Sequence, residues 1–369
     1  MQPVNASPLV RQEFHDLQGW VLDDHDAALK TFRRSCREIL NDALAFSRAV
    51  SFGGTKSDWI DLCHESMTAK DSRGFFETHF VPYRVNDAER PAGLFTGYYE
   101  PEAQGAKEPG GAFTVPVYGR PGDLVTFDRA QRKRTGLDYG RVTDGIPRPY
   151  FSRMEIERGA LKGRGLELLW LREWADAFFM QIQGSGSVRL PDGSIIRLSY
   201  AAKSGRAYTG IGALLVERGV FTREQMSMQA IRAWMNENPE KARHLMWENQ
   251  SFVFFREVRL EDPDLGALGA QHVQLTPERS IALDRNIWMF GTPVWLETAA
   301  PAEQTGGLQP FHKLLIAQDT GTAIKGHARG DVYWGSGETA GHIAGLMKSP
   351  GKMIVLLPKS IAQRLGLKS

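Results

Sequence analysis

Apolar side chains recur at three- and four-residue spacing between residues 24 and 50, which predicts an amphipathic helix. Acidic residues at its start, in the sequence DDHDAAL, are favoured there by the helix dipole, a simpler explanation than a metal site. Two shorter helices are predicted next, one opening at Ser57 and one in the sequence SRGFFETHF. The recurring apolar positions of the first helix are Leu29, Phe32, Cys36, Ile39, Leu40 and Ala43.

The pattern changes to β-strands after these helices. A run from Leu94 to Tyr99 predicts a strand, and Pro101 with the Gly- and Pro-rich residues behind it marks a domain boundary. Short strands then alternate with turns from Thr114, and a helix is predicted in SRMEIERGAL. The stretch AFFMQIQGSGSVRLPDGSIIRLSYAA predicts a long strand, a Pro-Asp-Gly turn and a return strand. Two further helices are predicted between residues 207 and 239.

The last third of the chain returns to predicted strands, beginning with NQSFVFFREV. Short strands separated by Gly and Pro, with one helix in ETAGHIAGLMK, favour a compact barrel. A β-rich middle between two segments of mixed helix and strand indicates an inserted domain. We therefore expect a discontinuous domain of residues 1–103 and 245–369, and an inserted β-rich domain of residues 104–244.

Length and composition limit the function classes. A chain of 369 residues favours two domains, and 42% apolar with 24% charged residues is ordinary for a globular protein. The net charge is +2 with both signs interspersed, which gives no indication of nucleic-acid binding. No apolar run reaches the roughly 18 residues of a transmembrane helix. No signal peptide is visible, so a cytosolic protein and a mature or trimmed exported chain are both open.

The chain has two cysteines, Cys36 and Cys63, and neither lies in a Cys-x-x-Cys motif, which argues against zinc. Each falls on the apolar face of a predicted helix. Two interpretations stay open, a pair of small buried thiols or a disulfide between packed helices. The second would imply an oxidising compartment.

Asp319 opens the sequence DTGT after an apolar run, which is how an aspartic protease presents a catalytic carboxylate. Such a protease needs two of these signatures, because two carboxylates share one proton. The chain has one, since Asp144 in VTDGIP lacks the hydroxyl residue. The sequence GSGETAG is weak as a dinucleotide fingerprint, because no early βαβ unit surrounds it. Neither class is favoured.

Three aspartates, Asp284, Asp319 and Asp331, fall within 48 residues in β-rich surroundings. A turn-forming role is the ordinary explanation for each of them alone. Together they indicate a shared polar cluster, and Asp331 precedes the aromatic run VYWGSG. In that run Trp334 could stack on a sugar or belong to the core. A carboxyl group beside aromatic rings suits glycoside cleavage, because a raised pKa lets it protonate a leaving oxygen.

Several long motifs resemble one family, that of the membrane-bound lytic murein transglycosylases A. SIALDRNIWMFGTPVWLET and AQDTGTAIKGHARGDVYWGSGETAGHIAG resemble its three-aspartate domain. LFTGYYEPE, FFMQIQGSGSVRL, YAAKSGRAYTGIG and NQSFVFFRE resemble the rest of the family, in the expected order. The resemblance implies a mainly β fold with flanking helices. It also implies a double-psi β-barrel domain, a smaller inserted β-rich domain and a substrate groove between them.

The resemblance also implies an activity. The family cleaves the β-1,4 bond between N-acetylmuramic acid and N-acetylglucosamine in peptidoglycan without adding water, and leaves a 1,6-anhydromuramoyl end. Its catalytic aspartate matches Asp331, which we expect to act as the general acid and base. We expect Asp319 to support it from nearby, and Asp284 to be structural. The residues expected to contact substrate are Thr96, Tyr98, Gln183, Ser185, Lys325 and Trp334.

No set of His, Cys and carboxylate residues has ligand spacing, so we expect activity without a metal or other cofactor. The expected partner is a peptidoglycan glycan strand, with no nucleic acid and no transmembrane segment, and with contacts to other cell-wall enzymes possible. We expect a monomer. The family implies the periplasm or cell envelope, often by a lipid tether, although no cysteine precedes Cys36. A non-catalytic peptidoglycan-binding module and a hydrolytic β-glycanase are the alternatives.

Overall fold

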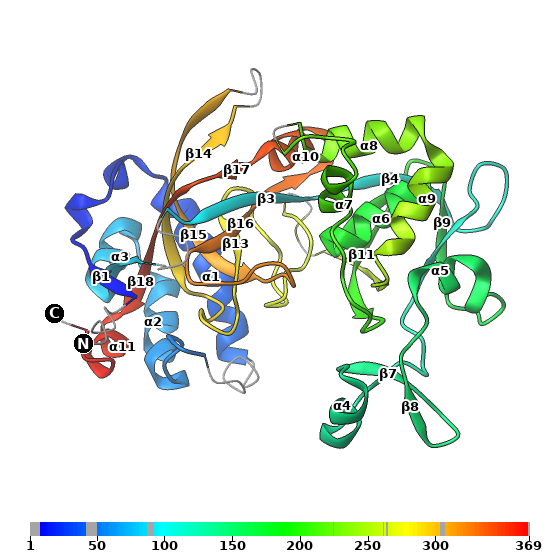
Figure 1. Cartoon of the computed structure of the whole chain (residues 1–369). Coiled ribbons are helices and arrows are strands. Elements are labelled where there is room, and N and C mark those ends of the chain that lie inside the picture. The colour runs from blue at the N-terminus through cyan, green and yellow to red at the C-terminus, as the bar shows by residue number, and fades with distance from the viewer. Residues whose placement is uncertain are drawn as a thin grey trace, which may run out of the picture. The chain divides into compact units, whose positions relative to one another are not determined.

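The structure is a computed structural model that describes residues 8–41, 50–86, 92–223, 225–260, 262, 265–302 and 307–367. The chain forms two compact units. The first unit comprises Met1–Tyr99 and Asp262–Ser369, and the second unit comprises Glu100–Glu261 (Figure 1). The predicted domain limits fall elsewhere, after residues 103 and 244. A limit after residue 244 would cut through helix α9 (Pro239–Glu248), which contacts two other helices of the second unit.

The first unit is built on a nine-stranded sheet. Across the sheet the described strands run from β1 at one edge to β17 at the other, and no pairing among them joins the two edges into a closed barrel. All pairs with a defined register are antiparallel except β13 with β15. The order is β1 (Leu9–Arg11), β2 (Phe80–Val85), β18 (Gly351–Pro358), β14 (Pro293–Pro301), β15 (Leu308–Asp319), β13 (Ser280–Leu283), β16 (Arg329–Ser336), β3 (Leu94–Glu100) and β17 (Lys348–Ser349).

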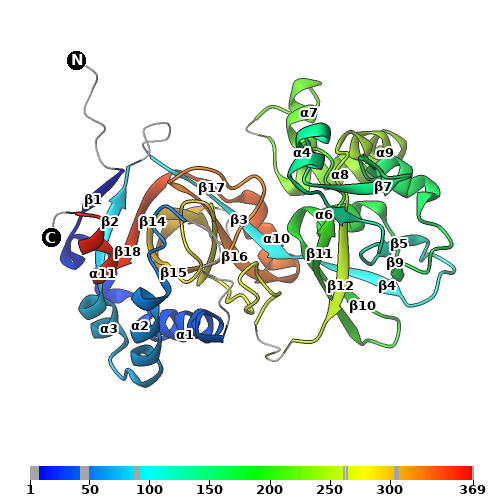
Figure 2. The ribbon, with the colours of Figure 1, turned by 90° about the horizontal axis from the view of Figure 1, so that it is seen from below.

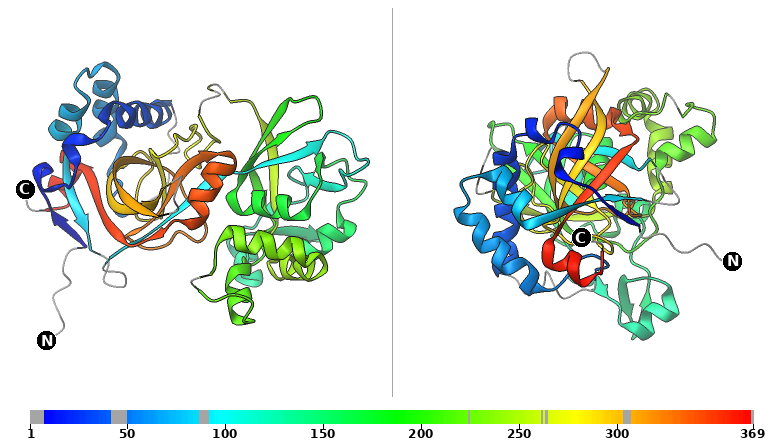
Figure 3. Two further views of the ribbon diagram at one scale, coloured as in Figure 1. Left: turned by 90° about the horizontal axis from the view of Figure 1, so that it is seen from above. Right: turned by 90° about the vertical axis from the view of Figure 1, so that its left-hand side faces the viewer.

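Three helices from the N-terminal part of the chain gather on one side of this sheet, as Figures 2 and 3 show. They are α1 (His25–Asn41), α2 (Lys56–Thr68) and α3 (Ser72–His79), and they confirm the three predicted helices. The predicted extension of the first helix through residues 42–49 lies outside the described residues. The other helical elements described in the unit are the 3₁₀ turns η1 (Phe14–Asp16) and η2 (Trp20–Leu22), and the helices α10 (Gly337–Leu346) and α11 (Lys359–Arg364).

Alternate residues of the central strands supply two separate cores, because successive side chains of a strand point to opposite faces. One core lies between the sheet and helices α1–α3. Its strand residues include Trp295, Leu314, Ile316, Ile354 and Leu356. The other core lies on the opposite face, and its strand residues include Val294, Leu296, Leu315, Val355 and Leu357.

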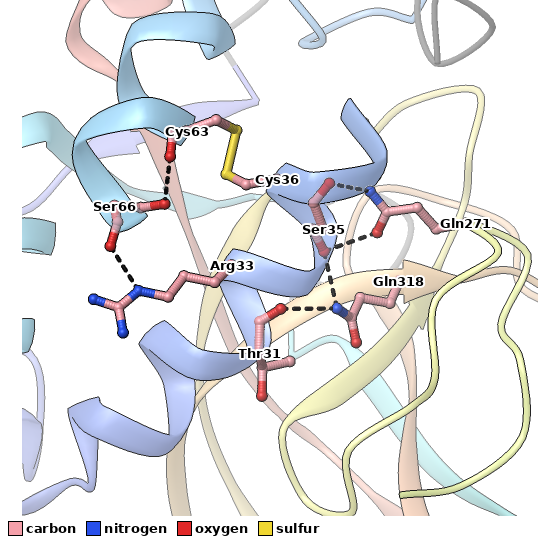
Figure 4. The surroundings of a disulfide bond; sticks show 8 residues. All are labelled: Thr31, Arg33, Ser35, Cys36, Cys63, Ser66, Gln271 and Gln318. Atoms are coloured by element: carbon pink, nitrogen blue, oxygen red, sulfur yellow. Dashed lines mark hydrogen bonds between the residues drawn. A yellow bond between two sulfur atoms is a disulfide. The ribbon is translucent and has the colours of Figure 1, made fainter. Parts of the chain in front are cut away.

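A disulfide joins Cys36 in α1 to Cys63 in α2 (Figure 4). Their Cα atoms are 5.0 Å apart, and both side chains are fully buried in the core beneath the helices. Of the two interpretations left open by the sequence, the structure has the bridged pair. The bond ties the two longest helices of the first unit together.

The second unit contains a six-stranded sheet and a separate three-stranded sheet. The order of the larger sheet is β12 (Val253–Val258), β11 (Ile195–Lys203), β10 (Ser185–Arg189), β4 (Glu102–Ala106), β9 (Glu167–Leu171) and β5 (Val115–Tyr118). The smaller sheet has the order β6 (Val125–Thr126), β7 (Tyr139–Thr143) and β8 (Ile146–Arg148). The helical elements are α4 (Arg129–Thr135), α5 (Arg153–Glu155), the π-turn η4 (Ile156–Ala160), α6 (Trp174–Gln183), α7 (Ile211–Glu217), α8 (Met228–Glu237) and α9.

One predicted strand of the second unit is wrong. The first half of the predicted hairpin is helix α6, which ends at Gly184 in a left-handed conformation, and only the pairing of β10 with β11 is confirmed. Helix α6 is buried on two sides. Ala177 and Met180 pack on the large sheet, whereas Phe178 and Phe179 pack on helices α7–α9. A helix buried on both sides lacks a polar stripe, so its apolar run cannot be told from a strand by periodicity.

Candidate active site

Two of the three predicted aspartates lie at the same level of the sheet, on either side of β13. Ala282 is the register partner of Asp319 in β15 and of Asp331 in β16. Residues directly opposite one another on neighbouring strands share a face of the sheet. Both carboxyl groups therefore lie on one face, with their backbones separated by two strand spacings, roughly 10 Å.

A β-bulge in β15 brings Asp319 to this level. Gln318 is the extra residue, inserted between the partners of two consecutive residues of β13. Its side chain is fully buried, and its Nε2 donates hydrogen bonds to the Thr31 carbonyl (3.0 Å) and the Ser35 hydroxyl (2.9 Å) of α1 (Figure 4). Helix α1 thus stabilises the irregular backbone that presents Asp319.

Asp331 accepts a hydrogen bond from a hydroxyl group of the neighbouring strand. Thr96 Oγ1 in β3 donates to Asp331 Oδ1 at 2.5 Å. Burial raises the pKa of Asp331 above the usual aspartate range, the Arg329 guanidinium and the Thr96 hydrogen bond lower it, and the Asp319 carboxylate raises it. The balance is a raised pKa. A carboxyl group in this state retains a proton that a free aspartate would lose.

The same contacts orient that proton. Arg329 Nη2 donates to Thr96 Oγ1 at 2.8 Å, so the hydroxyl hydrogen of Thr96 is directed to Asp331 Oδ1. Among the described residues, the Thr96 hydroxyl is the hydrogen-bond partner of the Asp331 carboxyl group, and Asp331 Oδ2 has no protein partner. A neutral Asp331 therefore carries its proton on Oδ2, where a substrate atom can take it. The side chain is partly exposed, which leaves room for that approach.

Asp319 differs because donors occupy both of its oxygens. The N–H groups of Ala270 and Thr320 donate to Oδ1 at 2.9 and 2.8 Å, and the Tyr98 hydroxyl donates to Oδ2 at 2.9 Å. Burial raises the pKa of Asp319, and these three hydrogen bonds oppose the increase. With no oxygen left over, Asp319 is suited to hold Tyr98 rather than to exchange a proton with a substrate.

Tyr98 donates to Asp319 and also lies within the electrostatic influence of Asp331. Burial, followed by the charge of Asp319, raises the pKa of Tyr98 well above its usual value, so the hydroxyl stays protonated. Its ring lies 5.2 Å from that of Tyr333, centroid to centroid. The residue before it must be glycine, because a Cβ on Gly97 would lie 2.7 Å from the Trp334 ring. The motif FTGYY therefore combines two polar groups with a close backbone approach.

The structure adds two groups that the sequence reasoning missed. Arg329 stands two residues before Asp331 on the same strand, so both side chains point to one face. That spacing was a usable signal, but the Arg sits in the unremarkable tripeptide Arg-Gly-Asp. Ala270 contributes only its backbone N–H, from a loop whose Gly266 lies against the Tyr333 ring. A backbone donor leaves no side-chain signal in the sequence.

Asp284 and Lys325 lie in a neighbouring turn rather than beside Asp331. Asp284 is 5% exposed, and it accepts hydrogen bonds from the N–H groups of Asn286 (3.1 Å) and Gly326 (3.3 Å). The Lys325 ammonium lies 3.6 Å from Asp284 Oδ1, and Lys325 is mostly exposed. These contacts suit the structural role expected for Asp284. They direct Lys325 to this turn, so its expected substrate contact stays a prediction.

Trp334 is partly buried. Its ring packs on Phe311 with centroids 5.4 Å apart, and its Nε1 lies 3.3 Å from Met347 Sδ. These contacts suit the core interpretation of Trp334. The sugar-stacking role stays a prediction.

Gln183 and Ser185 belong to the second unit, at the end of α6 and the start of β10. Ser185 is the register partner of Ser199 in β11, and both Gln183 and Ser185 are partly buried. Helix α6 ends between them at Gly184. Their expected contact with substrate stays a prediction.

Within the described residues, no three His, Cys, Asp or Glu side chains cluster as metal ligands would. The prediction that activity needs no metal stays a prediction. Among the same residues, no helix is both long and apolar enough to span a bilayer.

Comparison with known proteins places the chain in a family. Residues 94–256 match the MltA specific insert domain, and residues 279–357 match the 3D domain. The membrane-bound lytic murein transglycosylase A of Escherichia coli K12 is 37% identical over 310 residues, which is 82% of this chain and 76% of that protein. The chain belongs to the membrane-bound lytic murein transglycosylase A family.

Other relatives support the assignment. The Vibrio cholerae member is 37% identical over 263 residues, 70% of this chain, and the match spans 64% of the length of that relative. A crystal structure of the Agrobacterium tumefaciens membrane-bound lytic murein transglycosylase superposes with a TM-score of 0.87 at 34% identity, over 96% of this chain and 99% of that one. The E. coli family member with bound chitohexaose superposes with a TM-score of 0.65 at 30% identity, over 89% and 90% of the two chains.

Proposed function

We propose that the chain is a peptidoglycan lytic transglycosylase, a lyase that cleaves the β-1,4 bond between N-acetylmuramic acid and N-acetylglucosamine. Family membership supports the substrate class, because the relatives are named murein transglycosylases and one binds chitohexaose. The observation that carries the chemistry is Asp331. Its pKa is raised by burial, one oxygen is held by Thr96, and the other has no partner among the described residues.

The reaction begins with proton transfer from Asp331. The proton on Oδ2 passes to the glycosidic oxygen, the bond from that oxygen to C1 of the muramoyl residue breaks, and N-acetylglucosamine leaves with a free 4-hydroxyl. Oxocarbenium character develops at C1. General acid catalysis of this kind contributes roughly 10²–10⁴-fold to the rate. The step leaves Asp331 as a carboxylate.

The second half of the reaction restores the acid. The Asp331 carboxylate removes the proton of the C6 hydroxyl of the same muramoyl residue, and O6 forms a bond to C1. The product is a 1,6-anhydro ring, no water is consumed, and Asp331 is neutral again. A glycoside hydrolase needs a second carboxyl group to activate water or to attack the sugar. Here the nucleophile belongs to the substrate, so one acid and base is sufficient.

The surrounding residues prepare Asp331 for both steps. Arg329 and Thr96 fix which oxygen carries the proton. Asp319 holds the Tyr98 hydroxyl and, where ionised, disfavours a second negative charge at Asp331. We assign Thr96 and Arg329 as positioning residues. We assign Tyr98, whose hydroxyl hydrogen is donated to Asp319, as a hydrogen-bond acceptor at the edge of the substrate site.

Mass spectrometry of digested peptidoglycan tests the proposal. Products with 1,6-anhydromuramoyl ends are expected. Reducing muramoyl ends would instead identify a hydrolase, and binding without any release would identify a non-catalytic module. A variant at an exposed aspartate of α2, Asp61→Asn, is the control, because it makes the same chemical change away from the sheet.

Family membership also motivates finer proposals. We propose that the strands of the first unit have the double-psi β-barrel topology, and that the protein acts as a monomer in the periplasm or cell envelope. Relatives named membrane-bound support an envelope location, and the Cys36–Cys63 disulfide suits an oxidising compartment. Cell fractionation tests the location, and sedimentation analysis tests the oligomeric state.

A further inference from the structure

The small sheet of the second unit forms a projecting arm with helix α4. Figure 1 shows α4, β7 and β8 extending from the rest of that unit. The arm is attached firmly at its base. Asp123 accepts hydrogen bonds from Arg164 Nη2 (2.7 Å) and the Tyr150 hydroxyl (2.9 Å), and Leu124 and Tyr150 are buried in one apolar cluster. An arm with a fixed base can present its far end in a constant orientation.

The arm is strongly cationic. Residues 120–148 contain seven Arg or Lys and four Asp, whereas the whole chain is nearly balanced at 45 to 43. Three of those aspartates are engaged within the protein. Asp123 binds Arg164, Asp128 caps α4 through the Gln131 N–H, and Asp138 lies 3.5 Å from Arg132. The remaining acid, Asp144, is exposed at the hairpin turn.

Four exposed cations of the arm have neither an ion pair nor a side-chain hydrogen bond among the described residues, whereas the exposed Arg120 donates to the Leu124 carbonyl. The four are Arg129, Lys133, Arg134 and Arg148. Arg129 and Lys133 are four positions apart on α4, a like-charge spacing that destabilises a helix. Arg129 also stands in the first turn, where a positive charge opposes the helix dipole. The dipole favours Lys133 and Arg134, which stand in the last turn of α4. Helix stability therefore does not explain Arg129, and an external anion would.

The arm ends in an apolar hairpin tip. Asp144 and Gly145 both have positive φ values, 52° and 73°, as a two-residue type I′ turn requires. Val142 and Ile146, on either side of the turn, are 45% and 47% exposed. Val142 is paired with Pro147 and Thr143 with Ile146, so the two apolar side chains lie on opposite faces of the hairpin. Both faces of the tip are thus partly apolar.

A second hairpin of the same unit provides a contrast. The strands β10 and β11 also meet at an Asp-Gly turn, and Ile195 beside it is 45% exposed. The cation beside that turn, Arg189, is neutralised by a double hydrogen bond to Glu102. An exposed apolar residue at a turn is therefore ordinary in this unit. The arm differs because it combines exposed apolar residues at its turn with exposed cations that have no ion pair in the described part of the chain.

We propose that the arm docks on the surface of an anionic phospholipid bilayer. The cations of α4 and Arg148 contact the headgroup phosphates, and Val142 and Ile146 enter the interface, as basic amphipathic surfaces do. Asp144 keeps the tip at the depth of the headgroups, because its carboxylate is disfavoured deeper. An anionic cell-wall polymer would use the cations equally well. The lipid surface is favoured because it also accommodates apolar side chains on both faces of the tip.

Co-sedimentation with phospholipid vesicles tests the electrostatic part. The chain is mixed with vesicles of phosphatidylethanolamine containing phosphatidylglycerol, and with vesicles of phosphatidylcholine alone. Binding is expected to the anionic vesicles and to weaken with salt. The triple variant Arg129→Gln, Lys133→Gln, Arg134→Gln should bind on the order of a hundredfold less tightly, about fivefold for each cation.

A matched control removes the same charge elsewhere in the unit. Lys162, Arg223 and Lys241 are exposed, and a triple glutamine variant of these residues should keep its vesicle binding. Equal losses in both triple variants would show a general charge effect and overturn the proposal. Insoluble peptidoglycan is the second probe. The wild-type protein could bind peptidoglycan but not anionic vesicles, and the α4 variant could lose that binding. This result would assign the arm to the cell wall and would also overturn the proposal.

A fluorescent label tests the apolar part. Cys36 and Cys63 are bridged, so a cysteine introduced by Val142→Cys can be labelled selectively with an environment-sensitive dye. Anionic vesicles should shift its emission to the blue, while the same dye at Ile195→Cys should not respond. No shift at position 142, or equal shifts at both, would overturn the insertion of the tip. Vesicle binding does not involve the reaction, so its result is independent of the proposed activity.

Discussion

Asp331 and Asp319 lie at the same level of one sheet, on the same face, and burial raises the pKa of both. They differ in their hydrogen bonds. Within the part of the chain that the structure describes, Asp319 receives three donors spread over both oxygens, whereas Asp331 receives one, from Thr96. The comparison teaches that a raised pKa alone does not identify a proton donor. The carboxyl group proposed as the acid is the one that still has an oxygen free for the substrate.

The largest expected effect comes from removing Asp331, the group proposed to exchange the proton. Asp331→Asn keeps the size and the Thr96 contact but cannot release a proton, so turnover should fall at least 10²–10⁴-fold. Binding of chitohexaose, measured by calorimetry, should survive. Release of anhydromuropeptides at near the wild-type rate would reverse the assignment of roles between the two aspartates.

A smaller loss is expected at the other aspartate. Asp319→Asn weakens the hydrogen bonds that hold Tyr98 and should reduce turnover about ten- to a hundredfold, since hydrogen bonds to charged groups contribute about 1.5–3 kcal/mol each. The pH profile gives a second readout. Under the proposed mechanism activity requires protonated Asp331, so the pH profile has an alkaline limb on which activity falls. Loss of the Asp319 charge lowers the pKa of Asp331, so the alkaline limb of the pH profile should move to lower pH.

The control for this variant is Asp284→Asn. Asp284 also accepts backbone N–H groups and lies at the end of β13, but it belongs to the neighbouring turn. It should lower thermal stability and leave the alkaline limb in place. If Asp284→Asn moved the limb as far as Asp319→Asn, the shift would reflect general loosening of the sheet.

Thr96 should produce a shift in the opposite direction. Its hydrogen bond lowers the pKa of Asp331, so Thr96→Val should raise that pKa and move the alkaline limb to higher pH. Turnover should fall about five- to tenfold, the value of one hydrogen bond of about 1–1.5 kcal/mol. Thr96→Ser retains the hydroxyl and should restore both properties. A limb that moves down in Thr96→Val would contradict the proposed orientation of the proton.

The smallest expected effect is that of a chelator, which should leave the rate unchanged. An unchanged rate would mean that neither Asp319 nor Asp331 acts as a metal ligand. The difference between the two aspartates would then lie only in how each handles a proton. The rate of anhydromuropeptide release is measured after dialysis against EDTA and after adding back Mg²⁺ or Zn²⁺. Activity that disappears and returns with the ion would mean that the two carboxyl groups act through a shared cation.

The sequence predicted the parts of the site that have side-chain patterns. The strands carrying Thr96, Tyr98 and Asp331 follow from short β-rich runs bounded by Gly and Pro. The N-terminal helices follow from three- and four-residue spacing. Other features have no such pattern. The bulge at Gln318 depends on buried contacts with α1, and the Ala270 donor is a backbone group. Helix α6 resembled a strand because it is apolar on two sides.

The interruption of the first unit by residues 100–261 affects how the protein is made. Thr96 and Tyr98 are synthesised before the interruption, and Asp319 and Asp331 only after it. The second unit is continuous in sequence and can fold during synthesis, whereas the sheet of the first unit needs strands from both ends of the chain. Such distant pairings form slowly, because a long loop must close first. A nascent or truncated chain that ends before Asp331 therefore lacks the proposed acid, and it cannot attack the wall of the cell that produces it.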